Sequence, residues 1–475
     1  MKIPIATSLR GELSVPGDKS ISHRSVMLGA IAEGITEVRG FLKSADCLAT
    51  IECFRHMGIE IDEIKEENRY TGLQESVLII HGQGLHGLRE PLEALDAMNS
   101  GTTVRLLSGI LAGQSFHSYI KGDSSLQKRP MKRIIDPLTQ MGCRIESEYE
   151  NNCLPLEIYG GKLRAIHYSS SVASAQVKSC VLLAGLYADG PTTFFEPYPS
   201  RNHTELMLAA FGGNVKAKVD PLTMQPGAII YPGTALRGQK LRIPGDISSA
   251  AYFIAAGLIV PRSEIILRGV GINETRDGIL RVAKAMGGNV ITRNVRMEGR
   301  EPVADIIVMT SKLKGTNIGG ALIPALIDEI PIIAIMAACA EGDTEIYDAG
   351  ELRVKESDRL SAIVENLKNM DVDVEETEDG MIIHGAGGKK KRARRAPGRL
   401  GYFKGTVVDS LGDHRIAMAF SIAGLISDTQ MIVKDTECVS VSYPAFYRDL
   451  AKLANPFCSV KKQMGIWFIR LLFRS

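Results

Sequence analysis

The sequence has little net charge, and this absence narrows the classes of protein it can represent. Its 56 lysines and arginines nearly balance its 54 aspartates and glutamates, so the formal net charge is only +2. Such a chain lacks the broad positive field that draws proteins to nucleic acids or to anionic membranes. We therefore expect no nucleic-acid partner, and an anionic ligand must meet cations that are gathered locally.

Cross-links and apolar segments are also scarce. The eight cysteines form no CxxC pair and no zinc-like spacing with histidine, so we expect reduced core thiols and no metal. The opening stretch MKIPIATSLRGELSVPGDKS has no apolar signal core and no Arg- and Ser-rich transit stretch. No apolar run reaches the length that spans a bilayer. These absences predict a cytoplasmic protein with no membrane partner.

Two familiar site motifs are missing as well. No GxSxG is present, so a serine nucleophile has no local support. The stretch Gly17-Asp18-Lys19-Ser20 is similar to a phosphate loop, but the upstream glycine of GxxxxGK[ST] is absent. A lysine at the start of a helix still suits a phosphate, because its charge adds to the free backbone N–H groups.

What the 475-residue sequence does contain is repetition. A polar or Gly-rich turn, an apolar helix of small and branched residues, and a Gly with a β-like run recur in that order. The six instances begin at Pro16, Asn99, Ser171, Pro244, Asp328 and Gly412. Helices that are apolar almost all round are buried. The pattern predicts an α/β fold of six similar units with buried helices, grouped three and three in two lobes.

The lobe boundary is expected near Arg242, just before the second PGD motif. We assign residues 17–241 to the first lobe, residues 1–16 and 242–455 to the second, and residues 456–475 to an atypical C-terminal tail. The tail is interpreted as an unstructured extension, with a small amphipathic surface helix as the alternative. The basic run KKKRARR at residues 389–395 is interpreted as a solvated loop insertion, with a nucleic-acid patch as its alternative.

Each repeat places a polar turn at the N-terminus of a buried helix. Free N–H groups and the positive end of the helix dipole favour an anion there. The alternative is that these turns are merely helix caps, since Ser, Asp and Asn are good capping residues. That alternative is weakened because the same turns also carry Lys, Arg and His.

The segment Glu351–Leu360 concentrates charge at the start of an expected amphipathic helix. On a helix, Lys355 and Arg359 would share a face, as would Glu351 and Lys355. A ladder of ion pairs on a solvated helix is the plain alternative. However, a cation near the positive end of a helix is electrostatically misplaced unless an anion binds there.

Eight motifs follow one another in the order PGDKSISHR, NSGTTVRLL, SLQKRPM, ASAQVKS, SRNHTE, IDEIP, LRVKESDRL and DHRIAM. Together they resemble the EPSP synthase family of 3-phosphoshikimate 1-carboxyvinyltransferases, from the N-terminus to about Asn455. The forms SLQKRPM and ASAQVKS are similar to the class II branch. The resemblance implies two lobes of three βαβαββ units each, with the active site in the cleft between the lobes. It also implies a monomer that uses no metal or organic cofactor.

The resemblance further implies the transfer of the enolpyruvyl group of phosphoenolpyruvate to the 5-hydroxyl of shikimate 3-phosphate, with release of phosphate. The residues expected to hold phosphoenolpyruvate are Lys19, Gly101, Arg129, Arg359 and Arg415, with a possible contact from Gln176. Those expected to hold shikimate 3-phosphate are Lys19, Ser20, Arg24, Ser174, Gln176, Arg201 and Lys355. Ala175 stands where some relatives have a second Ser.

The same resemblance implies the catalytic roles. Asp328, which also contacts substrate, is expected to be the general base, and Glu356 the proton donor to the methylene. Lys355 assists either step, and the assignment of the donor between Glu356 and Lys355 stays open. Lys19, which is expected to contact both substrates, is counted among the catalytic residues as well. Cations should keep Asp328 ionised, and burial should raise the pKa of Glu356. A simple acidic pair at a helix start is the alternative for Asp328-Glu329.

The sequence departs from the family pattern in places. Many relatives carry a Lys shortly before a Phe-Pro near the C-terminus, whereas Val441-Ser442-Tyr443-Pro444 has none. Gly101 is the small residue associated in this family with sensitivity to glyphosate, so we expect inhibition by glyphosate.

Three rival functions differ in class. A related transferase acting on UDP-N-acetylglucosamine typically uses a loop cysteine, and no cysteine adjoins Arg129-Pro130-Met131. A nucleic-acid-binding protein would use KKKRARR, and the near-neutral net charge argues against it. A degenerate family member would bind ligand without turnover, against which the presence of Asp328, Lys355 and Glu356 argues.

Overall fold

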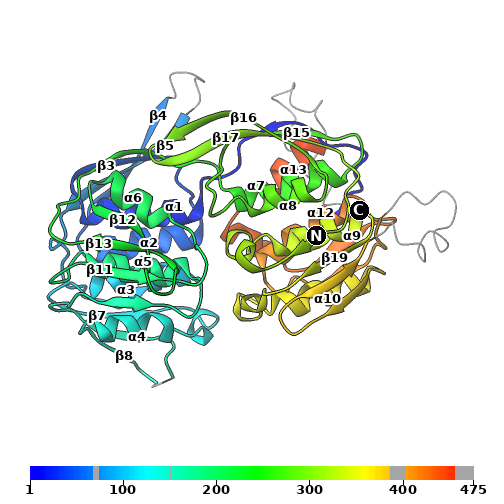
Figure 1. Cartoon of the computed structure of the whole chain (residues 1–475). Coiled ribbons are helices and arrows are strands. Elements are labelled where there is room, and N and C mark those ends of the chain that lie inside the picture. Colours follow the sequence, from blue (N-terminus) through cyan, green and yellow to red (C-terminus); the bar gives the residue numbers. More distant parts are fainter. Residues whose placement is uncertain (68–73, 150, 386–401, 455–475) are drawn as a thin grey trace. The chain divides into compact units, whose positions relative to one another are not determined.

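The computed structural model describes residues 1–67, 74–149, 151–385 and 402–454. These form two compact units (Figure 1). Unit 1 comprises residues 1–15, 247–295 and the chain from residue 304 on, and unit 2 comprises residues 16–246 and 296–303. The basic run at residues 389–395 and the tail at 456–475 lie outside the described residues, so the interpretations given for them stay predictions.

Unit 2 is built on three four-stranded sheets with the same layout. The first has the order β14 (Lys240–Arg242), β3 (Glu33–Arg39), β5 (Gln74–Gln83), β4 (Ile61–Glu67). The second has the order β6 (Leu95–Asp96), β7 (His117–Lys121), β9 (Leu156–Tyr159), β8 (Arg144–Ser147). The third has the order β10 (His167–Ser169), β11 (Thr192–Phe195), β13 (Pro226–Tyr231), β12 (Asn214–Val219). In each sheet the first two strands are parallel and the remaining pairs are antiparallel.

Unit 1 repeats the layout. Its first sheet has the order β2 (Arg10–Leu13), β15 (Glu264–Gly271), β17 (Glu301–Met309), β16 (Asn289–Glu298). The second has the order β18 (Asn317–Ile318), β19 (Asp343–Ile346), β21 (Met381–His384), β20 (Asp373–Glu376). Among the described residues, the third has three strands, in the order β22 (Val407–Val408), β23 (Met431–Val433), β1 (Lys2–Ile3). The tip of the β16–β17 hairpin, residues 296–303, is the part that belongs to unit 2.

Two helices alternate with the strands in most repeats. In unit 2 they are α1 (Lys19–Ile31), α2 (Ala45–His56), α3 (Gly101–Leu111), α4 (Lys132–Gln140), α5 (Ala175–Gly185) and α6 (His203–Ala210), with the 3-10 turn η1 (Leu126–Lys128). In unit 1 they are α7 (Ile247–Ile259), α8 (Gly278–Ala285), α9 (Ile330–Cys339), α10 (Arg359–Asn369), α12 (His414–Gly424) and α13 (Phe446–Ala454), with η2 (Gly320–Ala325), η3 (Gly350–Val354) and η4 (Thr436–Val441).

The six apolar helices predicted from the repeats are present and buried. They are α1, α3 and α5 in unit 2 and α7, α9 and α12 in unit 1, and within each unit they pack on one another. Small residues allow this close packing. A Cβ added to Gly109 of α3 would lie 2.3 Å from the backbone oxygen of Cys180 in α5, so the two helices meet backbone to backbone. The prediction of an α/β fold with buried repeat helices is confirmed.

Two strands change places between the repeats. Strand β2 precedes α1 in the chain but pairs with β15 of unit 1, while β14 precedes α7 but pairs with β3 of unit 2. The chain therefore passes from one unit to the other near residues 15–16 and again near residues 246–247. The sequence did not single out the hairpin tip at 296–303, because strand periodicity carries no information about which unit a hairpin tip packs on. The division into functional lobes stays a prediction.

Among the described residues, none of the helices combines the length and the apolar character needed to cross a lipid bilayer.

Candidate active site

The polar turns before the buried helices act as caps. Asp18 accepts a hydrogen bond from the N–H of Ile21 at 2.9 Å, and Asp413 accepts one from the N–H of Arg415 at 2.9 Å. Ser100 and Ser174 cap α3 and α5 in the same way. Each cap satisfies one of the four free N–H groups at a helix start, so capping leaves donors for an anion. The two interpretations of these turns are therefore compatible.

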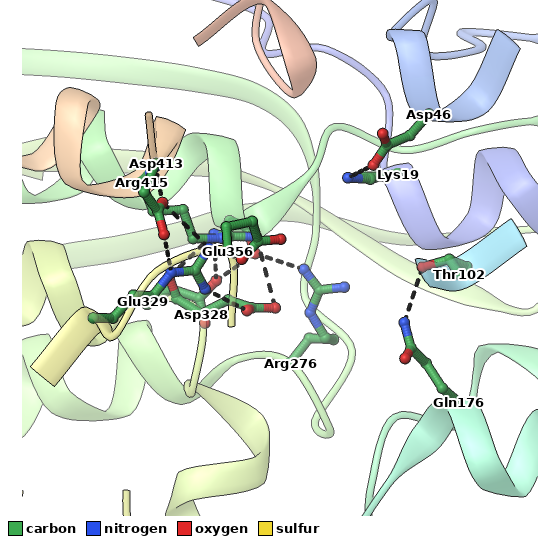
Figure 2. A network of polar contacts seen from close by, with 12 residues as sticks. Lys19, Asp46, Thr102, Gln176, Arg276, Asp328, Glu329, Glu356, Asp413 and Arg415 are labelled. Atoms are coloured by element: carbon green, nitrogen blue, oxygen red, sulfur yellow. Dashed lines mark hydrogen bonds and ion pairs between the residues drawn. The ribbon is translucent and has the colours of Figure 1, made fainter. Parts of the chain in front are cut away.

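The strongest cluster of charges in unit 1 surrounds Arg359, the first residue of α10. Figure 2 labels the carboxylates Asp328, Glu356 and Asp413 of this cluster. The Arg359 side chain is 1% exposed and contacts all three carboxylates. The Nε atom donates to Oδ2 of Asp413 at 2.8 Å, and Nη2 donates to Oε2 of Glu356 at 2.5 Å. The Nη1 atom lies 3.5 Å from Oδ1 of Asp328. The base and the proton donor predicted from the sequence thus share one guanidinium.

The charges in this cluster stabilise one another. Burial alone lowers the pKa of Arg359, but the charges of Asp413 and Glu356 outweigh it and the net shift is upward. Burial alone raises the pKa of Asp413, but the charge of Arg359 outweighs it and the net shift is downward. Both groups are therefore ionised at neutral pH. The neighbouring His414 is buried, which lowers its pKa to about 4 and leaves its ring neutral.

Arg415 brings a second guanidinium to Asp328. Its Nη1 donates to the backbone oxygen of Asp328 at 3.1 Å, and its Nη2 lies 3.6 Å from the carboxylate Oδ2. Arg415 belongs to the first turn of α12, and Asp328 precedes α9. The N-terminal ends of three helices of unit 1, α9, α10 and α12, thereby contribute to one group of charges.

The helix expected through Lys355 is absent, which corrects the prediction that Lys355 and Arg359 share a helix face. The 3-10 turn η3 ends at Val354, and α10 begins only at Arg359. The carboxylate of Asp358 caps this start by accepting a hydrogen bond from the N–H of Ser361 at 3.1 Å. Such an aspartate favours a helix start over a helix interior. Lys355 and Glu356 therefore lie in the short link before the helix.

Lys355 is the exceptional cation of unit 1. It is half-buried, yet its ammonium group forms no ion pair and no hydrogen bond with the residues that the structure describes. Burial lowers its pKa, with Arg359 acting in the same direction and Asp328 acting against it. The ion-pair ladder considered as an alternative is therefore wrong for Lys355. A half-buried ammonium that forms no direct ion pair is costly, and an anion bound beside it would lower that cost.

In unit 2, the predicted residues of α1 differ in their surroundings. Lys19 is paired with Asp46 of α2, and its side chain is 24% exposed (Figure 2). Ser20 is half-buried in the first turn of α1. Arg24 is buried and donates to Thr204 Oγ1 at 2.6 Å, to Ser179 Oγ at 2.7 Å and to the backbone oxygen of Ser20 at 2.9 Å. Burial lowers the pKa of Arg24 to about 10, which still leaves it charged.

The starts of α3 and α5 are joined through Gln176. Its Nε2 donates to Thr102 Oγ1 at 3.0 Å (Figure 2). Its Oε1 accepts from Arg105 Nη1 at 2.6 Å. A Cβ added to Gly101 would lie 3.0 Å from the same Nη1 atom. Gln176 and Gly101, predicted separately from two motifs, thus adjoin one arginine.

The remaining predicted residues of unit 2 lie in loops. Arg129 follows η1 and donates from Nη2 to Asn99 Oδ1 at 2.8 Å. Ser174 is the cap of α5, and Arg201 is half-buried in the segment before α6. The predicted residues therefore form two groups, one in each unit. Each residue lies near the start of a helix or in a loop beside one.

The sequence missed several partners of these residues. Asp413 lies within the DHRIAM motif, but the resemblance assigns a role only to Arg415 there. Asp46 and Arg105 have no motif of their own that could have indicated them. Glu329, whose side chain is fully buried, accepts a hydrogen bond from Ser248, which also receives one from Arg276 at 2.7 Å. Only the fold brings these groups together, because they are far apart in sequence.

A metal is not assigned. Among the described residues, Glu60, Asp62 and His81 have ligand atoms within 4.8 Å of one another. Both carboxylates are exposed, and the strands β4 and β5 carry none of the predicted site residues. Exposed acidic groups of this kind are common without an ion.

Six repeated α/β units place cations at buried helix starts, an arrangement that is suited to binding small anions. The family described as EPSP synthase (3-phosphoshikimate 1-carboxyvinyltransferase) matches residues 3–450. The 3-phosphoshikimate 1-carboxyvinyltransferase of Geobacillus kaustophilus is 51% identical over 95% of this chain and 100% of the relative. The 3-phosphoshikimate 1-carboxyvinyltransferase of Thermoanaerobacter sp. (strain X514) is 50% identical over 93% of this chain and 96% of the relative. An EPSP synthase structure from Acinetobacter baumannii has a TM-score of 0.81 at 44% identity, covering 95% of this chain and 97% of that one. The chain belongs to the EPSP synthase family.

Proposed function

We propose that this chain transfers the enolpyruvyl group of phosphoenolpyruvate to the 5-hydroxyl of shikimate 3-phosphate, with the charges of unit 1 performing the proton transfers. The family membership supports the reaction. The half-buried ammonium of Lys355, which forms no ion pair with the described residues, is the observation that carries the site assignment. The reaction is an addition followed by an elimination. The hydroxyl oxygen bonds to C2 as C3 gains a proton, and loss of phosphate with a proton from C3 then restores the double bond.

Asp328 is proposed as the general base that takes the hydroxyl proton. Its carboxylate lies 3.5 Å from Arg359 Nη1 and 3.6 Å from Arg415 Nη2, and its side chain is 15% exposed. The two guanidiniums fix the orientation of the carboxylate without enclosing it. A positioned general base contributes about 10²- to 10⁴-fold to a rate.

Glu356 is proposed as the donor of the proton to the methylene. Its carboxylate accepts a hydrogen bond from Arg359 at 2.5 Å, and a cation at that distance stabilises a charged carboxylate. An anionic substrate that binds to Arg359 would compete with Glu356 for the guanidinium and add a like charge nearby. Both effects favour protonation of Glu356, so substrate binding itself would prepare the acid.

Lys355 is proposed to hold an anionic group of shikimate 3-phosphate, with Lys19, Ser20, Arg24, Ser174, Gln176 and Arg201 as the further ligands of that substrate. Lys19, Gly101, Arg129, Arg359 and Arg415 are proposed for phosphoenolpyruvate. Charge-assisted hydrogen bonds to phosphate and carboxylate are the strong type, which suits two substrates that carry both groups. The expectations of a monomer and of no cofactor stay predictions.

The test is release of phosphate from phosphoenolpyruvate with shikimate 3-phosphate as acceptor, and separately with UDP-N-acetylglucosamine. Turnover with shikimate 3-phosphate alone is the expected result. Turnover with the nucleotide sugar would favour the rival transferase. Absence of turnover with both acceptors, from protein shown to be folded by circular dichroism, would overturn the proposal and favour a degenerate family member.

A further inference from the structure

Unit 2 contains a buried lysine that no substrate role explains. Lys178 lies in the second turn of α5, and its side chain is 4% exposed. Its ammonium lies 3.0 Å from Glu196 Oε1, 2.9 Å from Glu205 Oε1 and 3.1 Å from the backbone oxygen of Ser200. Three acceptors satisfy the three N–H donors of an ammonium. The group is therefore fully engaged inside the protein and is not available to a ligand.

Glu196, the residue after strand β11, extends this network to two segments. Its Oε1 also accepts from the backbone N–H and the hydroxyl of Ser200, both at 2.8 Å. Its Oε2 accepts from the backbone N–H of Ser174 at 3.2 Å. One buried carboxylate thus fixes the residue that caps α5 and the residue that precedes Arg201. Ser174 and Arg201 are both proposed ligands of shikimate 3-phosphate.

Glu205 connects the network to a third proposed ligand. Burial lowers the pKa of Arg24, and the charge of Glu205 is the largest influence acting against this. Arg24 also donates to Thr204, the residue before Glu205, and to Ser179, the residue after Lys178. Each contact in the network therefore includes a proposed ligand of this substrate, or a residue that is one or two positions from such a ligand in the sequence.

Stability of the fold is a weak explanation for this arrangement. Apolar residues of similar volume often replace a buried ion pair without loss of stability, so such a pair is weak evidence for a stabilising role. The network does fix geometry, because each carboxylate oxygen of Glu196 has a defined donor. It also neutralises acidic charge, since Glu196 and Glu205 would otherwise oppose a phosphate dianion bound nearby.

We propose that Lys178 and Glu196 are positioning residues that hold Ser174 and the Ser200–Arg201 segment in place for the acceptor substrate. The inference rests on the proposed function and adds to it a pair of residues that touch neither substrate. Loss of the pair weakens binding of shikimate 3-phosphate and leaves the handling of phosphoenolpyruvate much less affected.

The experiment compares Lys178→Met, Lys178→Arg and Glu196→Gln with the wild type. Calorimetry gives the Kd of shikimate 3-phosphate, and the phosphate-release assay gives the KM of each substrate. We expect Lys178→Met to raise the Kd of shikimate 3-phosphate at least tenfold, with the KM of phosphoenolpyruvate within threefold of wild type. Lys178→Arg keeps the charge and should recover most of the loss, which a mere packing role would not predict.

Leu182→Ala is the matched control, because Leu182 is buried one turn further along α5 and belongs to the apolar core. It should lower the melting temperature and leave the Kd of shikimate 3-phosphate unchanged. If Lys178→Met does not fold, Glu196→Gln is judged by the same tenfold criterion, since glutamine still accepts the hydrogen bonds of Ser200 but loses the charge.

Each outcome decides the question. Unchanged binding in the folded variants overturns the inference and leaves the proposed function intact. An equal loss in Leu182→Ala also overturns it, because the effect would then be one of general stability. A wild-type chain that binds no shikimate 3-phosphate overturns the inference and the proposed function together.

Discussion

At the scale of single residues, Arg359 is held by more charge than any other group of unit 1 described above. Three carboxylates contact its guanidinium, and two of them, Asp328 and Glu356, are proposed to move protons. The third, Asp413, is fully buried and caps α12. We therefore infer that the three carboxylates have different roles. Asp413 holds the Arg359 side chain in place, and the other two carboxylates change partner or protonation when substrate binds.

The Asp413→Asn variant tests this difference in roles. Asparagine still caps a helix, so the change removes the charge and keeps the cap. Removal of one partner of a buried ion pair costs about 3–5 kcal/mol of unfolding free energy. Denaturant unfolding should show a loss of that order. Asp371→Asn, in which the parent side chain is 73% exposed, is the control and should stay within about 0.5 kcal/mol of wild type.

The pH dependence of this stability has a defined sign. The pKa of Asp413 is lowered in the folded protein, so its contribution is present above the ordinary value of 3.8 and is lost as the pH falls through the folded pKa. The variant should therefore lose less stability than wild type on acidification below about pH 4. Identical acid unfolding curves for the two proteins would contradict this account of the cluster.

A further prediction at this scale concerns Lys355 and the pH dependence of activity. Its pKa is lowered by burial, so activity that needs the ammonium should decline with rising pH below the ordinary lysine value of 10.5. Lys355→Arg keeps the charge and should move the alkaline limb of kcat/KM upward, while Lys355→Met should lose activity about 100-fold or more at pH 8. Equal inactivity of both variants would instead assign the proton-donor role to Lys355, because arginine cannot release a proton.

At the scale of elements, the start of α3 shows how little space a helix terminus leaves. A Cβ on Gly101 would approach only Arg105 Nη1 closely, and that atom is the far end of a flexible side chain. Gly101→Ala should therefore fold normally. We predict that wild type is inhibited by glyphosate and that the variant needs at least tenfold more inhibitor. Wild-type turnover that a large excess of glyphosate leaves unchanged would contradict the role proposed for Gly101.

The sheet containing β19, β20 and β21 carries a histidine between carboxylates. His384 Nδ1 lies 2.9 Å from Asp343 and Nε2 lies 3.5 Å from Glu375, and the hydrogen bond that Asp343 accepts from the ring is the main cause of the raised pKa of His384. A raised pKa adds stability that is complete below the ordinary value of 6.5 and is lost as the pH rises through the folded value.

The magnitude of this effect is small, because the histidine is one-third exposed and its partners are more exposed still. We expect the free energy of unfolding of wild type to exceed that of His384→Gln by a few tenths of a kcal/mol at pH 5.5. At pH 8.5 the two values should be equal, and 1 M salt should reduce the difference at pH 5.5. A difference that persists at pH 8.5 would show that packing, not charge, holds this histidine.

Elements also show what the sequence could predict. The six buried helices were predicted because apolar character all round a helix and a capping residue are both local signals. The helix through Lys355 was predicted wrongly because the cap at Asp358 competes with it, and spacing alone cannot decide between two possible starts. The exchange of β2 and β14 could not be predicted, because strand pairing depends on contacts far apart in sequence.

At the scale of the whole molecule, the sequence predicted the cations better than their counter-ions. Lys19, Arg24, Arg359 and Arg415 came from motifs that resemble a family, as did the partners Asp328 and Glu356. Other partners came only from the fold. Asp46 and Glu196 lie outside the eight motifs, and nothing local distinguishes them from surface carboxylates. Asp413 and Glu205 lie within DHRIAM and SRNHTE, but the resemblance gave neither of them a role. Which residues bind substrate and which hold the binding residues in place is therefore a question that only the three-dimensional contacts address.

The central claim is that Asp328 is the general base of an enolpyruvyl transfer, and the most direct test is phosphate release by Asp328→Asn with both substrates saturating. Asparagine preserves shape and cannot accept the proton, so kcat should fall about 10²- to 10⁴-fold. The melting temperature and the Kd of shikimate 3-phosphate should stay close to wild type. A folded variant that turns over within threefold of wild type would contradict the assignment and move the base elsewhere.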